Sequence, residues 1–280
     1  MHAPIQWRWG LLVVLGFAAL PNIAQASSYS AAVSANSPVS YYRLEETSGT
    51  SAADLGSANI AGTYTGNYTQ GQAGIPGGDT TDNAAAFNTN GTYTGYVGVP
   101  SYTAITNYPV TIEAFIKTST ANGSDATPEI AGIASTTDSA SNLCIDLQSG
   151  VAGLKFRNDA AQNLITGGGN IANGSWHQVV GVFDSATQRE LYVDGTLANS
   201  STISTTFPTG INTFGIGTLD RATPADYING TIDEVSVYNT ALTAAQIHTQ
   251  FVASGVPEPA SIGLLAVSAC ALLIRRRKVI

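Results

Sequence analysis

The chain of 280 residues carries 11 Lys and Arg against 19 Asp and Glu, which gives a formal net charge of −8 at pH 7. Four of the basic residues form one run, Arg275–Lys278, so the stretch from Ser27 to Gly255 has six basic and eighteen acidic residues and a net charge of −12. Such an acidic surface repels nucleic acid and anionic lipid and favours cations, which excludes nucleic-acid-binding classes. The two cysteines, Cys144 and Cys270, give no disulfide framework, and Cys144 is predicted to be a small buried side chain.

The amino-terminal segment has the pattern of a cleavable signal peptide. Arg8 precedes the apolar run Leu11–Leu20, and Ala24-Gln25-Ala26 supplies a small-residue cleavage pattern. The export machinery recognises this order of positive charge, short apolar stretch and small residues. The run is short for a membrane-spanning helix. We therefore expect residues 1–26 to be a signal peptide and the mature protein to begin near Ser27.

Period-two alternation of apolar and polar side chains, typical of half-buried strands, recurs along the body of the chain. In the segment 110–117 four apolar residues share one face, and Phe115 lies on the other, so we expect that face to be partly covered too. The segment 176–183 is rich in β-branched and aromatic residues. Asp194-Gly195 predicts a hairpin over 190–197, since these residue types suit the positive-φ positions of a type I′ turn. Further strands are predicted at 39–44, 153–157, 213–217 and 231–238.

One helix is predicted near the end of the body. Thr243 and Gln246 form a capping box, Leu242 and Ile247 stand where a hydrophobic staple forms, and Gly255 ends the segment. Many short strands, one short helix and Gly-rich turns predict an all-β fold, a two-sheet antiparallel sandwich or jelly roll.

A different pattern begins at Val256. The residues 256–259, Val-Pro-Glu-Pro, precede an apolar stretch over 260–274 and then the basic run. An apolar segment that a basic cluster closes stops in a membrane with its positive end in the cytoplasm. The stretch is short for a full span, so we expect transient rather than permanent anchoring.

Five segments, in their order and spacing, resemble the laminin-G-like, concanavalin-A-like jelly-roll family of bacterial secreted and cell-surface proteins. They are Tyr41–Gly49, Thr111–Lys117, Trp176–Phe183, Leu191–Gly195 and Gly230–Tyr238. The resemblance implies a two-sheet jelly roll of about a dozen strands that occupies residues 27–255 as one domain.

The carboxyl-terminal segment 256–280 resembles the PEP-CTERM sorting signal. The residues that carry this resemblance are Pro257, Glu258 and Pro259 before the apolar stretch and Arg275, Arg276 and Arg277 after it. The resemblance implies recognition by an exosortase-type sorting protease, cleavage of the tail, and release to the cell surface or exopolysaccharide. We therefore expect an exported protein of the cell envelope or extracellular matrix, anchored in the membrane before processing.

Catalytic residues are not predicted. A hydrolase on this fold needs two carboxylates on one strand face, whereas Glu45-Glu46 and Asp233-Glu234 are adjacent pairs expected to face opposite sides. His177 and His248 are the only histidines of the body, and it contains no G-x-S-x-G elbow. We expect a structural role for His177 and solvent exposure for His248.

A structural calcium ion is implied by the resemblance, since laminin-G-like domains often hold one at a rim. Asp54 matches the acid of the amino-terminal loop, and Asp233 matches the acid near the last strand. Calcium takes several oxygen ligands at once, which carboxylates and loop carbonyls provide. Leu55-Gly56 departs from the usual Ser-Gly pair of that loop. The alternative is that both Asp residues cap turns and strand ends.

The sequence favours a non-catalytic extracellular adhesion or binding module whose ligand is carbohydrate or a surface protein. Sugar binding uses aromatic faces beside polar donors, and several tyrosines of Gly-, Thr- and Asn-rich segments are candidates for one rim. These are Tyr64, Tyr68, Tyr93, Tyr96, Tyr102 and Tyr108, none of which is assigned to a ligand. A polysaccharide-active hydrolase or lyase and a purely structural envelope protein stay open as alternatives.

Overall fold

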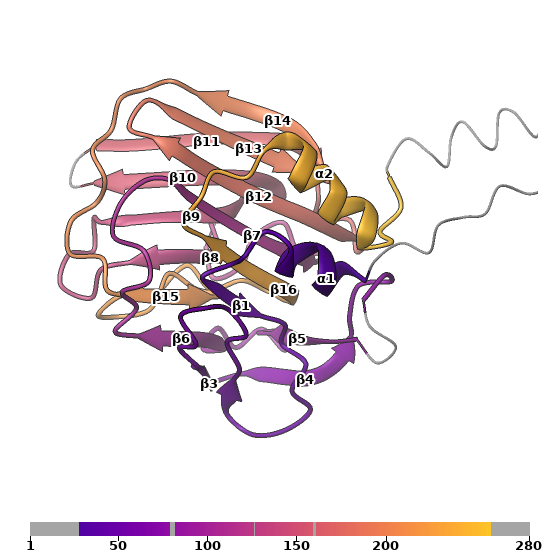
Figure 1. Ribbon diagram of the computed structural model, residues 1–280. Coiled ribbons are helices and arrows are strands. Elements are labelled where there is room, and N and C mark those ends of the chain that lie inside the picture. Colours follow the sequence, from indigo (N-terminus) through magenta and orange to yellow (C-terminus); the bar gives the residue numbers. More distant parts are fainter. Residues whose placement is uncertain (1–27, 79–81, 126, 159–160, 259–280) are drawn as a thin grey trace, which may run out of the picture.

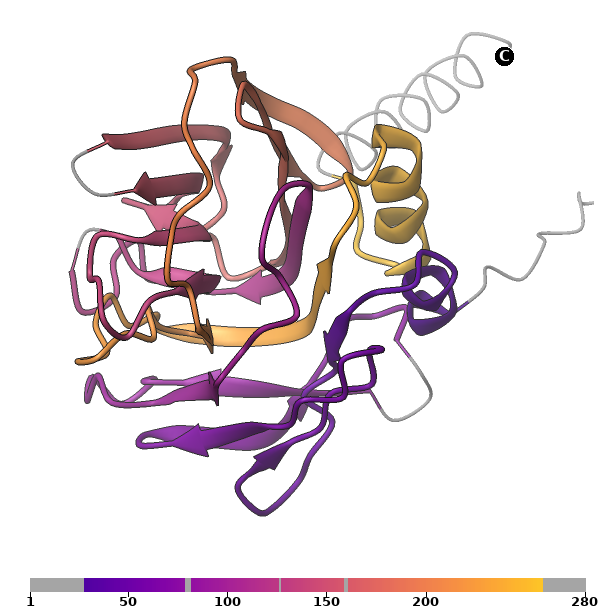
Figure 2. The same cartoon turned by 60° about the vertical axis from the view of Figure 1, so that its left-hand side comes forward.

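A computed structural model describes residues 28–78, 82–125, 127–158 and 161–258. Within them, two antiparallel sheets of eight strands each pack face to face, and two helices lie against the outer face of one sheet (Figures 1 and 2). The predicted all-β, two-sheet sandwich is confirmed. The described part has sixteen strands rather than about a dozen.

The first sheet, here called sheet A, has the strand order β14-β13-β12-β7-β16-β5-β4, and β1 pairs with β16. Its strands are β1 (Ser40–Tyr42), β4 (Tyr68–Ala73), β5 (Asn83–Phe87), β7 (Val110–Lys117), β12 (Trp176–Ser185), β13 (Gln188–Val193), β14 (Thr196–Ser201) and β16 (Gly230–Tyr238).

The second sheet, sheet B, has the order β11-β10-β9-β8-β15-β6-β3-β2. Its strands are β2 (Ser51–Ala52), β3 (Gly62–Thr65), β6 (Tyr96–Pro100), β8 (Glu129–Ala134), β9 (Asn142–Gln148), β10 (Val151–Asn158), β11 (Ala161–Asn170) and β15 (Thr213–Ile216).

The strands predicted from alternation all lie on observed strands. Their ends differ by at most two residues for β1, β7, β10, β12, β15 and β16. The hairpin turn is also as predicted, because Asp194 and Gly195 between β13 and β14 have φ values of 50° and 71°. Alternation was informative here because one side of each strand packs against the opposite sheet.

The main core fills the space between the sheets. Strand β7 shows how the sequence builds it, because the alternate residues Val110, Ile112, Ala114 and Ile116 are all fully buried there. Phe115 points away from this core into a second, smaller one beneath the helices. The expectation that the second face of this strand is covered is therefore confirmed.

Helix α2 (Ala244–Ala253) begins with the predicted capping box, in which Thr243 and Gln246 bond each other's backbone amides. Leu242 and Ile247 are buried in the second core. Helix α1 (Tyr29–Ser34) was not predicted, since six residues are too few for a helical period to show. The two helices lie side by side over sheet A (Figure 1).

Tyr29 fixes α1 to sheet A. Its ring meets Phe115 edge-on at a centroid distance of 5.2 Å, and its hydroxyl donates a 2.8 Å hydrogen bond to Glu113 Oε1. Gln178 Nε2 donates to the same oxygen at 2.7 Å. Burial raises the pKa of the Glu113 carboxyl to about 7, and these donors oppose the rise.

None of the described helices is long and apolar enough to cross a membrane. The predicted signal peptide 1–26, most of the tail, Pro259 and the basic residues Arg275, Arg276 and Arg277 lie outside the described residues. Pro257 and Glu258 are described, and both are exposed.

We expect Glu113 to make the fold less stable as the pH rises. Its pKa is about 7 in the folded protein against 4.5 ordinarily, so the folded state holds a proton that the unfolded chain releases between these values. The free energy of unfolding should fall across this window by at most about 3 kcal/mol. Glu113→Gln should remove this part of the fall, measured by thermal unfolding from pH 4.5 to pH 8. The partly exposed Glu190→Gln is the matched control, and parallel curves for wild type and Glu113→Gln would contradict the prediction.

Candidate functional site

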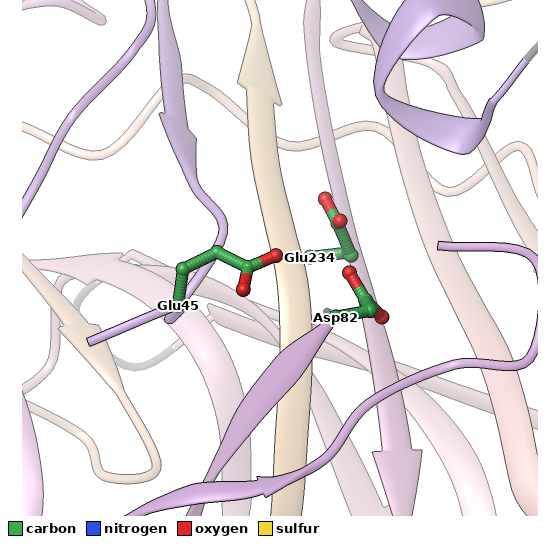
Figure 3. A group of neighbouring side chains, drawn as sticks. All are labelled: Glu45, Asp82 and Glu234. Atoms are coloured by element: carbon green, nitrogen blue, oxygen red, sulfur yellow. The ribbon is translucent and has the colours of Figure 1, made fainter. Parts of the chain in front are cut away.

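Three acidic side chains from separate segments converge beside β1 and β16. Glu45 follows β1, Asp82 precedes β5 and Glu234 lies within β16 (Figure 3). One carboxylate oxygen of each lies within 4.8 Å of the others. We call these three residues the acidic cluster.

Arg43 binds all three members of the acidic cluster. Its Nη2 lies 2.6 Å from Glu45 Oε1 and 3.2 Å from Asp82 Oδ1, and its Nε lies 3.2 Å from Glu234 Oε1. The Tyr41 hydroxyl donates a further hydrogen bond to Glu234. One guanidinium therefore offsets three carboxylates.

Asp233 also lies at this place, which corrects the expectation that Asp233 and Glu234 face opposite sides. The register of β16 shifts between Asp233 and Ser236, and Glu234 has a φ of 54°. This bulge breaks the alternation, so both acids interact with Asp82.

The cluster is short of positive charge. Asp233 is fully buried; its Oδ2 accepts the Ile75 amide at 3.0 Å, but its Oδ1 has no hydrogen-bond partner among the described residues. Burial and neighbouring acids raise its pKa well above the ordinary value. Burial likewise raises the pKa of Asp82 to about 6 and that of Glu234 to about 8. A bound cation would relieve this repulsion, so the donor set fits a hard metal ion.

Asp54, the other predicted calcium ligand, lies in the loop after β2 and away from the acidic cluster. Its carboxylate accepts three backbone amides, from Tyr41 at 2.7 Å, Gly56 at 2.8 Å and Ile60 at 2.9 Å. Neither Asp54 nor Asp233 belongs to the group of three converging acids found among the described residues. Asp54 thus organises its own loop, which agrees with the turn-capping alternative.

A polar pocket of about 260 Å³ lies on the outer face of sheet B. Side chains alternate between the two faces of a strand, and Leu143, Ile145 and Leu147 of β9 point into the core. The residues between them therefore point outward, toward the pocket. We call it the sheet B pocket, and its lining residues are Thr127, Asn142, Gln148, Lys155, Arg157, Gln162, Leu164, Leu219, Arg221 and Asp226.

A buried charge network underlies the sheet B pocket. Lys155 Nζ on β10 lies 3.7 Å from Asp146 Oδ2 on β9 and 3.6 Å from Asp226 Oδ2 in the loop after β15. Glu129, at the start of β8, and Asp146 are both fully buried. Burial raises the pKa of Glu129 to about 8 and that of Asp146 to about 6. These acids surround the Lys155 ammonium and fix it at the base of the pocket.

The buried Cys144 also belongs to this network, since it is free, fully buried and lies next to Glu129. Its prediction as a small buried side chain is confirmed, but its neighbours are charged rather than apolar. Gly132 leaves room for the Glu129 carboxylate, because a Cβ there would meet both Glu129 and Cys144.

A second pocket of about 410 Å³ adjoins the first, and the two share Arg221. Four of its eight lining residues carry hydroxyl groups, namely Thr136, Thr137, Ser139 and Thr223. The two pockets therefore meet at Arg221, in the loop after β15.

Sequence reasoning missed the sheet B pocket because its residues come from three strands and two loops. The sequence did contain one sign of the pocket, because polar side chains alternate with apolar ones on β9 and on its neighbour β10, of which only β10 was predicted. These polar residues are Asn142, Asp146, Lys155 and Arg157. Strand pairing, which brings Lys155 opposite Cys144, could not be foreseen from one sequence.

The other candidates from the sequence are the six tyrosines and the two histidines of the body. Tyr64 and Tyr102 are buried in the main core, so the six tyrosines do not form a common rim. His177 Nδ1 lies 2.8 Å from Asp194 Oδ2 and its Nε2 lies 3.1 Å from Asn173 Oδ1, which ties strand β12 to the hairpin turn. His248 is exposed, as expected.

A family model described as the concanavalin A-like lectin/glucanases superfamily (Laminin_G_3) matches residues 90–248. The chain belongs to this superfamily. The matched range contains every lining residue of the sheet B pocket, whereas Glu45 and Asp82 of the acidic cluster lie before it. No curated protein sequence matches the chain.

Solved structures share the fold of this superfamily member at low sequence identity. The binding domain of Paraclostridial Mosquitocidal Protein 1 has a TM-score of 0.59 and 14% identity, over 77% of this chain and 52% of that one. A structure described as a receptor binding domain has a TM-score of 0.61 and 15% identity, over 81% and 53%. The botulinum neurotoxin serotype G binding domain has a TM-score of 0.58 and 10% identity, over 77% and 50%. The chain therefore spans about half the length of these structures.

Proposed function

We propose that this protein is a non-catalytic carbohydrate-binding module and that the sheet B pocket is its binding site. The observation that carries the proposal is the pocket itself, in which amide side chains of Asn142, Gln148 and Gln162 stand beside fixed charges. Amides and charges of this kind form the directed hydrogen bonds by which proteins orient sugar hydroxyls. The helices cover sheet A and leave this face of sheet B accessible (Figure 2).

The fold relatives agree with a binding role. The three structures reported above are described as binding or receptor-binding domains. The position of the acids supports a non-catalytic site, because general acid catalysis requires a carboxyl group within hydrogen-bond reach of the scissile oxygen. Glu129 and Asp146 are fully buried beneath the pocket, and Asp226, the acid of the described lining, is paired with Lys155.

The purified protein should bind members of a glycan panel through the sheet B pocket. Replacing two amides in the variant Gln148→Ala/Gln162→Ala should weaken that binding by about tenfold or more, since each lost hydrogen bond contributes about 1 kcal/mol. The matched control is Gln188→Ala, an exposed amide on sheet A. Titration calorimetry measures the affinities. Equal binding by wild type and the double variant would contradict the site, and release of reducing sugar would contradict the non-catalytic role.

A structural calcium ion at the acidic cluster is the second part of the proposal. Glu45, Asp82, Asp233 and Glu234 would hold it, and Arg43 would supply the remaining positive charge. The unpartnered Asp233 Oδ1 and Asp82 Oδ2 supply oxygens for a hard cation. When bound, such an ion stabilises the junction of β1, β5 and β16 by offsetting the repulsion among these acids.

Removal of calcium should lower the melting temperature of the wild-type protein, and added calcium should restore it. The reason is that an ion which binds the folded protein and not the unfolded chain stabilises the folded state. Asp82→Asn should abolish the response to EDTA. Asp54→Asn should lower the melting temperature through its lost amide contacts yet keep the response. If EDTA leaves the melting temperature unchanged and the purified protein holds no metal, no ion binds here.

The third part of the proposal concerns location. The signal-peptide and sorting-tail patterns support export to the cell envelope, with the tail serving as a transient membrane anchor until an exosortase-type protease removes it. The described part of the tail is consistent with protease access, since Pro257 and Glu258 are exposed.

In a host with such a sorting system, intact mass analysis of the surface fraction should find a chain that begins near Ser27 and lacks the tail after the Pro-Glu-Pro motif. Glu258→Ala should leave the longer, unprocessed chain in the membrane fraction. Recovery of the full-length wild-type chain from the cytoplasm would contradict export altogether.

A further inference from the structure

We propose that Tyr96 and Tyr227, with the Asp220 carboxylate beside them, form a stacking subsite for a neutral sugar ring next to the sheet B pocket. This inference rests on the proposed function, because it adds a second subsite to the same binding face. It follows from which aromatic rings of the molecule neither core covers.

Partly exposed aromatic rings are few in this protein. Of the twelve tyrosines, seven are buried, and Tyr68 and Tyr108 pack against the main core. The described phenylalanine and tryptophan side chains are likewise buried or packed against one of the two cores. Among the described residues, the partly exposed rings outside both cores are therefore those of Tyr93, Tyr96 and Tyr227.

Two of these three rings contact each other. The ring centroids of Tyr96 and Tyr227 lie 6.1 Å apart, and their planes meet at 66°. A ligand that stacks on the face of one ring therefore also touches the other. Sugar rings carry C–H groups that pack on an aromatic face, while their hydroxyls bond polar groups at its edge. The pair thus offers the apolar part of a sugar-binding surface.

The Asp220 carboxylate supplies the polar part. A Cβ on Gly98 of β6 would meet Tyr96 Cε2 at 2.9 Å and Asp220 Oδ2 at 3.3 Å, so the ring and the carboxylate share the space above this glycine. Burial, with a further contribution from Asp220, raises the pKa of both tyrosine hydroxyls. Within the described part of the chain, Asp220 accepts a hydrogen bond from Thr213 through Oδ2. Its Oδ1 is placed to accept a sugar hydroxyl.

The two tyrosines are held in place before any ligand arrives. The Tyr227 amide donates to Ser124 Oγ at 2.9 Å, and its carbonyl accepts the Ser124 amide at 2.9 Å. Tyr227 also forms a β-bridge with Glu129. Tyr96 lies on β6, where it pairs with Thr65 of β3. Rings whose backbone is already fixed lose less conformational entropy when they bind a ligand.

The loop after β15 separates these rings from the sheet B pocket. Asp226 reaches Lys155 on β10 at 3.6 Å, whereas the next residue, Tyr227, meets Tyr96 on β6. Strands β10 and β6 are four steps apart in the sheet, with β8 and β15 between them. At the usual strand spacing this separation is about 19 Å. A single sugar therefore occupies one subsite, whereas an oligosaccharide can reach both.

The charges near the rings favour a neutral sugar. Asp220 lies beside both rings, and Asp226 directly precedes Tyr227. The stretch 27–255 carries a net charge of −12. A carboxylate accepts hydroxyl hydrogens but repels the carboxylate or sulfate of an acidic sugar.

The test compares neutral with acidic oligosaccharides of equal length. The purified protein is titrated in a calorimeter with cellohexaose, mannohexaose, xylohexaose and maltohexaose, and with the hexamers of galacturonate and mannuronate. We expect at least one neutral hexamer to bind about tenfold or more tightly than either acidic one.

Tyrosine variants locate the subsite. Tyr96→Ala and Tyr227→Ala should each weaken binding of the preferred hexamer by about tenfold, because each removes a stacking face. Tyr227→Phe keeps the ring and should stay within about threefold of wild type. Tyr93→Ala, which removes the third partly exposed tyrosine, is the matched control and should leave the affinity unchanged.

A second measurement needs no variant. Tetranitromethane nitrates exposed tyrosines of the wild-type protein, and peptide mapping by mass spectrometry reports the extent at each one. The preferred hexamer should slow nitration of Tyr96 and Tyr227 and leave that of Tyr93 unchanged. A variant that fails to fold therefore leaves the test intact.

The outcomes that overturn the inference are distinguishable. If a hexamer binds through Gln148 and Gln162 but neither depends on the two tyrosines nor protects them, the stacking subsite is wrong while the binding function stands. Acidic hexamers that bind as tightly as neutral ones would overturn the selection for a neutral sugar. If wild type binds no glycan at all, the proposed function fails and the inference fails with it.

Discussion

The packing of two sheets through alternate side chains is the constraint on which the other features depend. In β7 and β9 every second residue is aliphatic and enters the main core, which forces the residues between them outward. On sheet A these outward residues, Phe115 among them, are covered by the helices and form a second core. On sheet B the outward positions are Asn142, Asp146 and Lys155, and the sheet B pocket forms there. The same alternation therefore produces a covered face on sheet A and a face with a polar pocket on sheet B.

Buried acids recur at each of these places, and each is stabilised differently. Glu113 lies under α1 and is stabilised by neutral donors from Tyr29 and Gln178. Glu129 lies beneath the sheet B pocket. The nearby Lys155 lowers the pKa of its carboxyl group, but burial raises that pKa by more. Removing a carboxylate from water costs several kcal/mol unless it is paired or protonated. The raised pKa values follow from this cost, and they make the charge of both outer faces depend on pH near neutrality.

How much the sequence could predict depended on the range of the interaction involved. Alternation and local turn chemistry predicted β7, the turn at Asp194-Gly195 and the capping box at Thr243, because those signals lie within a few residues. The acidic cluster was not foreseen, since the bulge at Glu234 cancels the alternation rule that separated it from Asp233. The charge network under the pocket depends on strand pairing, which a single sequence does not specify.

The pairing order explains why charged residues gather on sheet B. Strands β8, β9 and β10 are consecutive neighbours, so Glu129, Asp146 and Lys155 come together through short hairpins of one meander. Asp226 and Arg221 are then added by the loop after β15, a segment remote in sequence. The pocket thus has a base on paired strands and a rim on a loop, and the rim can change without changing the base. Under the proposed function, changes in the loop would alter ligand choice at the rim while Lys155 stays fixed by Asp146, so the fold would stay the same.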